Sequence, residues 1–225
     1  MIQLNKKIVL GSGSPRRQLL LKELGLNFRT LISDTAEIPI PGLMGRKIAE
    51  YLSDEKAEAL KNKINKDEIL ITADTIVWLN SHMLNKPANS EEAFNMLSSL
   101  SGRKHQVYTG VTIINASTKK TFSVESSVVF KILNENEIRK YISEFKPYDK
   151  AGSYGAQECL SEGINPCSEN EIKFLNKYQL DNFFEKTLAP EKKKHIPMID
   201  HIDGSYYNVM GLPIVELMEE LFVIG

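Results

Sequence analysis

Two adjacent arginines, Arg16 and Arg17, stand in the first turn of a predicted helix, in the stretch GSGSPRRQLLLKELG at residues 11–25. Ser14 is expected to cap this helix, and Pro15 suits its first position because the proline ring presets the backbone angle. The N-terminus of a helix carries a partial positive charge, which disfavours each arginine by about 0.3–1 kcal/mol. The pattern therefore indicates that an anion binds there. The alternative is a helix start whose arginines extend into solvent.

A carboxylate and two lysines also invite a chemical interpretation. Asp74 interrupts the apolar run ILITADTIVWL, and a buried lone carboxylate is costly unless it is paired, protonated or bound to a metal. It is therefore a structural ion pair, a carboxylate at a wet strand end, or part of a site. Lys56 lies within the apolar stripe of a helix predicted over residues 46–64, where it either snorkels over the core or lines an anion-binding cleft. Lys86, in LNKPAN, follows a predicted hairpin and could reach the same place, although alone it would be a surface lysine.

The stretch YDKAGSYGAQ places Asp149 and Lys150 beside Gly152 and Gly155 and ends at Gln157. Glycine allows a backbone to approach a ligand closely, and a glutamine amide can recognise the edge of a base through one donor and one acceptor. A plain loop is the alternative, and this stretch alone does not decide between them.

The common phosphate and hydrolase motifs are absent. GSGSPRR lacks the spacing of a Walker loop, and Arg16 stands where a dinucleotide fingerprint needs its third glycine. The four histidines show no paired metal-ligand spacing, there is no G-x-S-x-G elbow, and Cys159 and Cys167 are interpreted as ordinary thiols. What remains is a cationic set with Asp74 and a second carboxylate, Glu37, which suits metal-assisted phosphoryl chemistry.

The composition limits where such a site can act. With 225 residues, 42% hydrophobic and 25% charged, the chain can bury a core as one large domain or two small lobes. Its formal net charge of −1 argues against bulk electrostatic binding to nucleic acid or to an anionic membrane, so an anion site must be local. No apolar run approaches the roughly 18 residues of a membrane helix, and no signal peptide is recognisable, so a cytoplasmic location is expected.

Short apolar runs alternate with helical patterns, which predicts an α/β fold with a mixed sheet. Strands are expected at KIVLG, NFRTLIS, EILITADTIVWL, HQVYTGVTII and TFSVESSVVFKI, the last two joined by a turn at Lys119 and Lys120, and another between Gly204 and Gly211. Helices are expected at residues 15–24, 46–64, 90–100 (opened by Ser90) and 135–145 (opened by a capping box of Asn134 and Glu137), and in GLPIVELMEELF.

Residues 158–203 depart from this rhythm, because they are polar and charged and include the run EKKK. A capping box from Ser168 to Glu171 predicts a helix that ends near Leu188. The segment is interpreted as a helical insertion, either a solvated decoration or a lid.

The motifs SGSPRR, SDTAE, LSDEKAEAL, ADTIV, NKP, LSGRKHQVYTGV, YDKAGSYGAQ and GSYYNVMGLP, in this order, resemble the signature set of the Maf family of nucleoside triphosphate pyrophosphatases. The resemblance covers nearly the whole chain outside the insertion, so residues 1–225 are expected to form a single Maf-like domain. It implies a mixed, curved α/β fold with flanking helices and two lobes around a central cleft, related to the inosine triphosphatase fold and commonly a homodimer. It also implies hydrolysis of a nucleoside triphosphate to the monophosphate and pyrophosphate.

The same resemblance assigns roles to individual residues. It implies that Asp74 is the proton acceptor and that Glu37 and Asp74 hold a divalent metal, Mg²⁺ or Mn²⁺. The three specificity positions, Arg16, Thr75 and Gln157, resemble the branch acting on dTTP and UTP. A pyrophosphatase for modified nucleotides such as 7-methyl-GTP and a nucleotide-binding regulator of cell division with little turnover are the alternatives. YGAQE departs from the more usual YGIQG, and the insertion leaves access to the base pocket and the dimer contact open. Phosphate contacts are expected from Ser12, Arg16, Arg17, Lys56 and Lys86.

Overall fold

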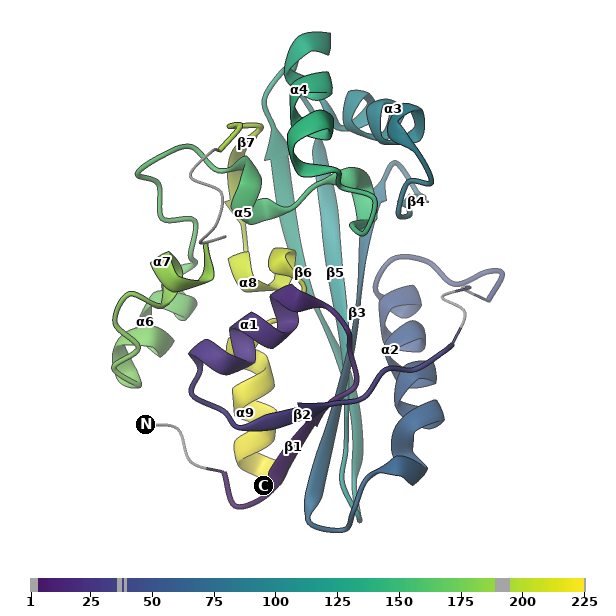
Figure 1. Ribbon diagram of the computed structural model, residues 1–225, viewed down its shortest axis with the longest axis vertical. Helices are drawn as coiled ribbons and strands as arrows, with labels where there is room; N and C mark the ends of the chain where they lie inside the picture. Colours follow the sequence, from purple (N-terminus) through teal and green to yellow (C-terminus); the bar gives the residue numbers. More distant parts are fainter. Residues whose placement is uncertain (1–3, 36–37, 39, 189–194, 225) are drawn as a thin grey trace.

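A mixed sheet of seven strands forms the centre of the protein (Figure 1). The structure, a computed structural model, describes residues 4–35, 38, 40–188 and 195–224. The strands are β1 (Lys7–Leu10), β2 (Phe28–Thr30), β3 (Glu68–Leu79), β4 (His82–Leu84), β5 (Lys104–Ile114), β6 (Lys119–Phe130) and β7 (Ile199–Asp203). Their order is β2-β1-β3-β5-β6-β7, with β4 also paired to β3. Since β1 runs parallel to β2 and β3 while the other pairs are antiparallel, the predicted mixed sheet is confirmed.

Helices cover both faces of this sheet. The helices are α1 (Pro15–Glu23), α2 (Arg46–Leu60), α3 (Ser90–Leu100), α4 (Glu135–Phe145), α5 (Ala156–Cys159), α6 (Glu169–Lys177), α7 (Phe183–Thr187), α8 (Tyr206–Met210) and α9 (Ile214–Ile224), with short 3₁₀ turns η1 (Lys61–Lys63) and η2 (Ala151–Ser153). Helix α2 lies against one face, and α1, α8 and α9 lie on the other (Figure 1). Helices α3 and α4 pack together at the far end of the long strands, so the molecule has two halves that β3, β5 and β6 connect.

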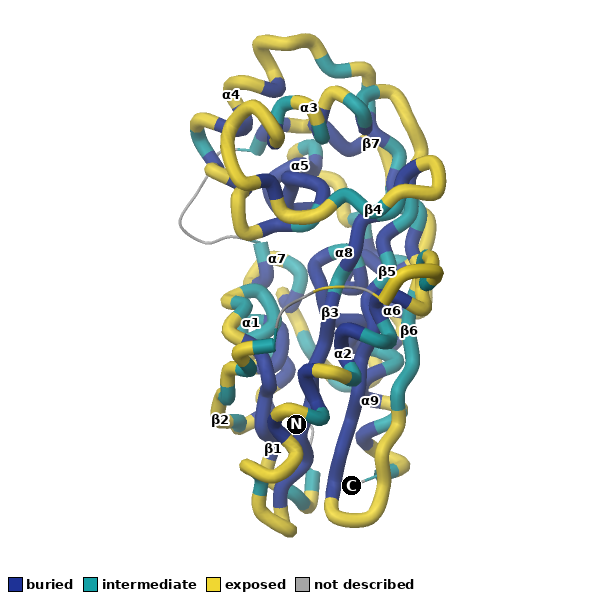
Figure 2. Tube along the Cα trace, turned by 90° about the vertical axis from the view of Figure 1, so that its right-hand side faces the viewer, coloured by how far each residue is buried: buried dark blue, intermediate teal, exposed yellow. Residues whose placement is uncertain are grey.

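Strand β3 is buried along nearly its whole length because helices cover it on both sides (Figure 2). Its odd-numbered side chains, such as Ile71 and Ala73, join the larger core on the side of α1 and α9. Leu70 and Ile76 instead pack against residues of α2. Since successive strand side chains point to opposite faces, Asp74 points toward α2 and Thr75 toward α1.

A glycine lets α2 lie directly on the sheet beside Asp74. Gly110 of β5 is the register partner of Asp74, and a Cβ atom built on it would lie 2.1 Å from the carbonyl oxygen of Ala49 in α2. No larger residue fits without moving the helix. Lys56 follows Ala49 by two turns on the same face of α2, so this close approach also aims Lys56 at β3.

Several predicted boundaries need correction. Lys119 and Lys120 begin β6 rather than forming the turn, because Asn115 closes the turn by accepting hydrogen bonds from the amides of Ser117 and Thr118. The strand predicted at NFRTLIS is shorter than expected, because only Phe28–Thr30 (β2) forms a strand. Helix α3 is capped by Asn89, whose Oδ1 accepts from the amides of Glu91 and Glu92, and not by Ser90. The capping box at α4 is confirmed.

The region between Gly204 and Gly211 is helix α8 and not the predicted strand. Ser205 caps this helix by accepting a hydrogen bond from the amide of Asn208 at 2.9 Å, and Gly211 ends it with a backbone angle φ of 111°, which side chains disfavour. The apolar composition that suggested a strand reflects burial of α8 instead.

The described part of residues 158–203 contains helices α6 and α7 where one helix was predicted. The capping box of Ser168 and Glu171 opens α6 as expected, but Gln179 and Asn182 adopt left-handed backbone angles of 54° and 59° and separate α6 from α7. The last five residues form β7 at the edge of the sheet. This segment is therefore a continuation of the core structure rather than helix alone.

Candidate active site

A gap along one edge of β3 opens into a cavity. β1 pairs with β3 up to Ile71 and β4 pairs with it from Val77 onward, so no described strand covers residues 72–76 on that edge. The cavity there measures about 340 Å³, within the size range of small-molecule sites. It lies at the carboxyl end of the parallel strand β1 and at the N-terminus of α1, a common place for ligands in α/β proteins.

The cavity joins residues from both halves of the molecule. One wall comes from the loop after β1 and the start of α1, and the opposite wall comes from residues 149–157. Glu37 lies outside the described residues, so the structure gives it no position. Every other site residue predicted from the sequence lines this cavity: Ser12, Arg16, Arg17, Lys56, Asp74, Thr75, Lys86 and Gln157.

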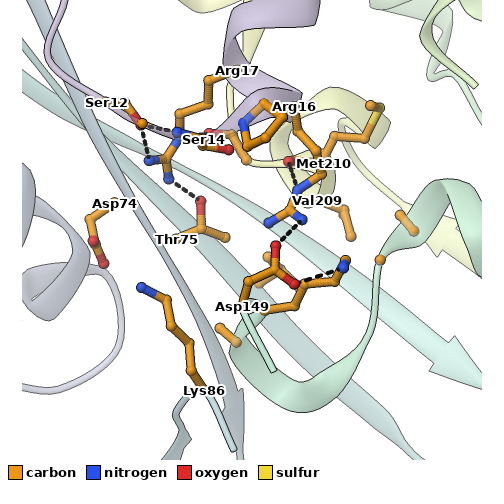
Figure 3. A pocket seen from close by; sticks show the side chains of 18 of the residues that line it. Ser12, Ser14, Arg16, Arg17, Asp74, Thr75, Lys86, Asp149, Val209 and Met210 are labelled. Atoms are coloured by element: carbon orange, nitrogen blue, oxygen red, sulfur yellow. Dashed lines mark hydrogen bonds and ion pairs between the residues drawn. The ribbon is translucent and has the colours of Figure 1, made fainter. Parts of the chain in front are cut away.

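Asp74 and Lys56 form a buried ion pair at the cavity wall. The two residues are 6% and 8% exposed, and the Lys56 ammonium contacts Oδ1 of Asp74. The sequence-based expectation that Asp74 needs a partner is confirmed, and Lys56 is that partner. Lys86, which follows β4, also directs its ammonium toward the Asp74 carboxylate (Figure 3). The ion pair thus faces a ligand-sized space, and a functional role for it stays a prediction.

The Arg17 side chain, near the N-terminus of α1, makes hydrogen bonds to Gly211, Ser12 and Thr75. Its Nε donates to the carbonyl of Gly211 at 2.8 Å, and its two terminal nitrogens donate to Ser12 Oγ and Thr75 Oγ1, both at 3.1 Å (Figure 3). Ser14 occupies the predicted N-cap position, but its side chain makes no capping hydrogen bond. The amides at the start of α1 therefore lack the partner that the sequence suggested, which suits an anion at this helix end.

Arg16, at the start of α1, connects to a chain of charges on the opposite wall. It donates to the carbonyl of Met210 at 3.3 Å and lies 3.4 Å from Oδ2 of Asp149. Asp149 also accepts from Lys150 at 2.8 Å, and Lys150 lies 3.6 Å from Glu158. Burial alone would raise the pKa of Asp149, but the hydrogen bond from Lys150 and the charges of Lys150 and Arg16 lower it overall. The Asp149 carboxylate thus holds two cations at the cavity.

Gln157 presents an unsatisfied acceptor. Its side chain lines the cavity on α5 and is 6% exposed, and its Oε1 is buried without a hydrogen-bond partner among the described residues. A buried polar atom without a partner is rare and costs free energy. A ligand that donates a hydrogen bond to Oε1 would remove that cost.

A buried hydrogen-bond network shapes the loop that carries Gln157. The Tyr141 hydroxyl donates to Glu158 Oε2 at 2.5 Å and accepts from the amide of Gly155 at 2.9 Å. Burial raises the pKa of Tyr141 well above its ordinary value. The sequence alone indicated no role for these residues, although Glu158 is one of the two positions, with Ala156, at which YGAQE departs from YGIQG.

Tyr154 on the same wall bonds to a neutral histidine. Its hydroxyl lies 2.8 Å from Nε2 of His105, and its ring packs edge-on against Phe130. Burial lowers the pKa of His105 to about 4 and raises that of Tyr154 well above its usual range. Both groups are therefore uncharged near neutral pH and act in shaping the cavity.

The described part of residues 158–203 lies away from the cavity mouth. Apart from Glu158 itself, which contacts Lys150, its side chains pack on the side of α1, α8 and α9, with Phe174 and Phe183 in the main core. Glu171 is 1% exposed, and Cys159 and Cys167 are free and buried. Among the residues described there, none lines the cavity; the run EKKK lies outside the described residues, so the solvated decoration and the lid both stay predictions.

The described side chains at the cavity could hold a metal ion only together with a bound ligand. Two described carboxylates line the cavity, Asp74 and Asp149, and each is paired with a cation. Within the described ranges no three His, Cys, Asp or Glu side chains gather as a closed metal site requires. Mg²⁺ commonly uses one or two carboxylates together with substrate phosphates and waters, a set to which Asp74 can contribute.

In the described part of the chain, no helix combines the length and apolarity needed to cross a bilayer.

The fold and the cavity define a class: an α/β protein with a cationic, ligand-sized cavity around a buried carboxylate. The chain belongs to the Maf-like protein family, whose profile matches residues 7–171. A relative named dTTP/UTP pyrophosphatase from Bacteroides thetaiotaomicron is 40% identical over 217 residues, which cover 96% of this chain and 94% of the relative. Another of that name, from Parabacteroides distasonis, is 41% identical over 216 residues, covering 96% and 94%.

Among solved structures, the Staphylococcus aureus Ham1 protein matches with a TM-score of 0.37 and 18% identity, covering 56% of this chain and 72% of that one. A likeness of this size carries no argument about function.

Proposed function

We propose that this chain is a nucleoside triphosphate pyrophosphatase that acts on dTTP and UTP and releases pyrophosphate. The observation that carries the proposal is the single cavity in which Asp74 lies among Lys56, Lys86 and the arginines at the start of α1. Relatives that align over nearly the whole chain carry the name of this activity, which supports it.

The cationic side of the cavity would hold the triphosphate. The N-terminus of α1 and the Ser12 hydroxyl offer donors to phosphate oxygens, and Arg16 and Arg17 add charge where the helix dipole already favours an anion. Lys56 and Lys86 approach Asp74 from α2 and from the segment after β4. A bound triphosphate would thus bridge the two halves of the molecule.

Asp74 would act as the general base. In this step the Asp74 carboxylate accepts a proton from a water molecule, the water oxygen bonds to the α-phosphorus, and the bond between the α-phosphorus and the bridging oxygen breaks. Pyrophosphate leaves and the nucleoside monophosphate remains. A divalent metal, Mg²⁺ or Mn²⁺, held by Asp74 and Glu37, would neutralise charge on the phosphates. The Lys56 contact would orient the Asp74 carboxylate.

Gln157 would recognise the base, together with Arg16 and Thr75. Thymine and uracil carry an imide N–H that can donate to the unpartnered Oε1 of Gln157, whereas cytosine has an acceptor nitrogen at that position. A buried acceptor that lacks its donor disfavours the wrong base strongly. The geometry therefore supports dTTP and UTP over CTP.

The test is hydrolysis by the purified protein. dTTP, UTP, CTP and 7-methyl-GTP would each be supplied with Mg²⁺, with Mn²⁺ or with EDTA, and pyrophosphate release would be measured. We expect metal-dependent release from dTTP and UTP, with CTP at least about tenfold slower. Faster release from 7-methyl-GTP would move the protein to the modified-nucleotide branch. Binding of nucleotides without turnover would contradict the enzyme and favour a regulator. Light scattering of the same sample tests the expected homodimer.

A further inference from the structure

Helix α8 is the part of the cavity wall that holds both arginines. Val209, Met210 and Gly211, at the end of α8, line the cavity. The carbonyl of Met210 accepts from Arg16, and the carbonyl of Gly211 accepts from Arg17. The position of α8 therefore decides where these two cations lie relative to a bound triphosphate.

Helix α8 has only five residues, too few to be stable without support from its surroundings. Asn208 ties its middle to the sheet: its Oδ1 accepts from the amide of Thr109 at 3.1 Å, and its Nδ2 donates to the carbonyl of Val107 at 3.1 Å. The first amides of any helix lack partners within the helix, so the N-terminal end of α8 needs acceptors from elsewhere.

Glu171, from residues 158–203, supplies those acceptors. Its Oε1 accepts from the Ser205 hydroxyl at 2.7 Å and from the Tyr207 amide at 2.9 Å, while its Oε2 accepts from the Tyr206 amide at 3.1 Å. The same Oε2 also accepts from the amide and hydroxyl of Ser168, at 2.8 and 3.0 Å. One carboxylate thus caps the start of α6 and the start of α8 together.

In each of these hydrogen bonds the Glu171 carboxylate is the acceptor, and a carboxylate can only accept. A carboxylate buried to this degree is costly to place without such bonds, and charge-assisted hydrogen bonds to it are stronger than neutral ones. Glu171 also lies at the positive end of the α8 dipole. Glu171 is therefore well suited to hold the helix rigidly, although it does not line the cavity.

We propose that Glu171 is a positioning residue for triphosphate binding: through α8 it fixes the carbonyls of Met210 and Gly211, and through them Arg16 and Arg17. This inference rests on the proposed function. It gives Glu171, within residues 158–203, a role in holding the cavity wall in place through α8, without lining the cavity itself. A carboxylate at position 171 is then required for substrate affinity and not only for folding.

The test compares Glu171→Gln with Glu169→Gln, a matched change two residues away on α6, whose side chain is 90% exposed and pairs with Lys173 at the surface. The glutamine retains the size of Glu171 but replaces one acceptor oxygen with a donor that faces other donors. We expect the KM for dTTP to rise about tenfold with kcat changed less than about threefold, since small displacements of binding groups weaken transition-state and substrate contacts. Glu169→Gln should leave both unchanged. A fall in melting temperature with an unchanged KM would overturn the proposal.

A double-mutant cycle separates positioning from general destabilisation. Arg17→Lys removes one of the two side chains through which α8 acts, so Glu171→Gln should raise KM by a smaller factor in that background than in the natural chain. Equal effects of Glu171→Gln with and without Arg17 would contradict the coupling. If Glu171→Gln does not fold, Ser205→Ala removes one of the bonds to Glu171, and we then expect about a threefold rise in KM. An unchanged KM in that variant would count against the proposal.

A measurement without substrate distinguishes failure of this inference from failure of the proposed function. The Nε–H signal of Arg17 in a ¹⁵N NMR spectrum, assigned by its loss in Arg17→Lys, reports the hydrogen bond to Gly211. Glu171→Gln should shift this signal and Glu169→Gln should not, whether or not the protein hydrolyses dTTP. An unmoved Arg17 signal in Glu171→Gln would overturn the positioning role, and absent hydrolysis by the natural chain would overturn only the proposed function.

Discussion

Strand β3 carries two buried carboxylates that form ion pairs in different surroundings, one at its start and one in its middle. At the start, Glu68 accepts two hydrogen bonds from Arg29, at 2.7 and 2.8 Å, and one from the amide of Asn65 at 2.7 Å. In the middle, Asp74 contacts Lys56 and faces the cavity. Both pairs place a carboxylate from β3 against one cation from another element.

The difference lies in what surrounds each carboxylate. Glu68 is saturated by a two-pronged guanidinium and a backbone amide, and the hydrogen bonds from Arg29, followed by the one from Asn65, lower its pKa to about 2. Lys56 contacts Oδ1 of Asp74, and Asp74 also borders the cavity, which Lys86 and the two arginines line as well. A buried ion pair thus indicates a functional site when it borders a ligand-sized cavity, and indicates a structural contact when all its lone pairs are already used.

The largest expected contrast is in turnover. Asp74→Asn keeps the shape of the side chain but removes its basicity, so pyrophosphate release from dTTP should fall by about 10²–10⁴-fold, the usual range for a general base. Circular dichroism should show an intact fold. Glu68→Gln is the matched change on the same strand and should retain normal turnover. Near-normal turnover in Asp74→Asn would remove Asp74 from the reaction.

The next contrast compares two lysines of one helical segment, Lys56 beside Asp74 and Lys61 at the surface. Lys56→Ala should raise the KM for dTTP by about tenfold, because it removes a charge from the phosphate side of the cavity. Lys61→Ala, at the end of the same helical segment, removes an exposed lysine that pairs with Glu58 and should leave KM unchanged. If Lys56→Ala lowers only the melting temperature, Lys56 is a core lysine that snorkels and plays no part in binding.

The sequence indicated the residues that line the cavity better than it indicated the elements that hold them in place. Asp74, Lys56 and the two arginines could be found because each breaks a local rule of burial or of helix charge. Glu171 could not, since a glutamate three residues after a serine is a normal capping box, and its second role depends on the distant α8. The same holds for α8, whose helical state depends on Ser205, Gly211 and contacts made only in the folded protein.

The start of β3 should matter for stability and not for chemistry. Glu68→Gln leaves the Arg29 side chain with a weaker partner, so the free energy of unfolding should fall by about 1 kcal/mol, the usual worth of such hydrogen bonds near a surface. Urea unfolding of the variant and the natural chain measures this difference, and kcat and KM for dTTP should agree within about twofold. A change in KM for dTTP as large as that expected from Lys56→Ala would erase the distinction between the two ends of the strand.

Acid should reveal the smallest effect, and its sign follows from the pKa of Glu68. The ordinary pKa of this carboxyl is 4.5 and its folded value is about 2, so between these values the unfolded chain binds a proton that the folded chain does not. Folding is therefore favoured by ionised Glu68 above pH 4.5, and that contribution is lost as the pH falls toward 2. The stability difference between the natural chain and Glu68→Gln should thus shrink steadily from pH 5 to pH 2.5 in urea titrations. A difference that stays constant over this interval would show that the Arg29 contact does not depend on the charge of Glu68, and the start of β3 would then owe its stability to packing.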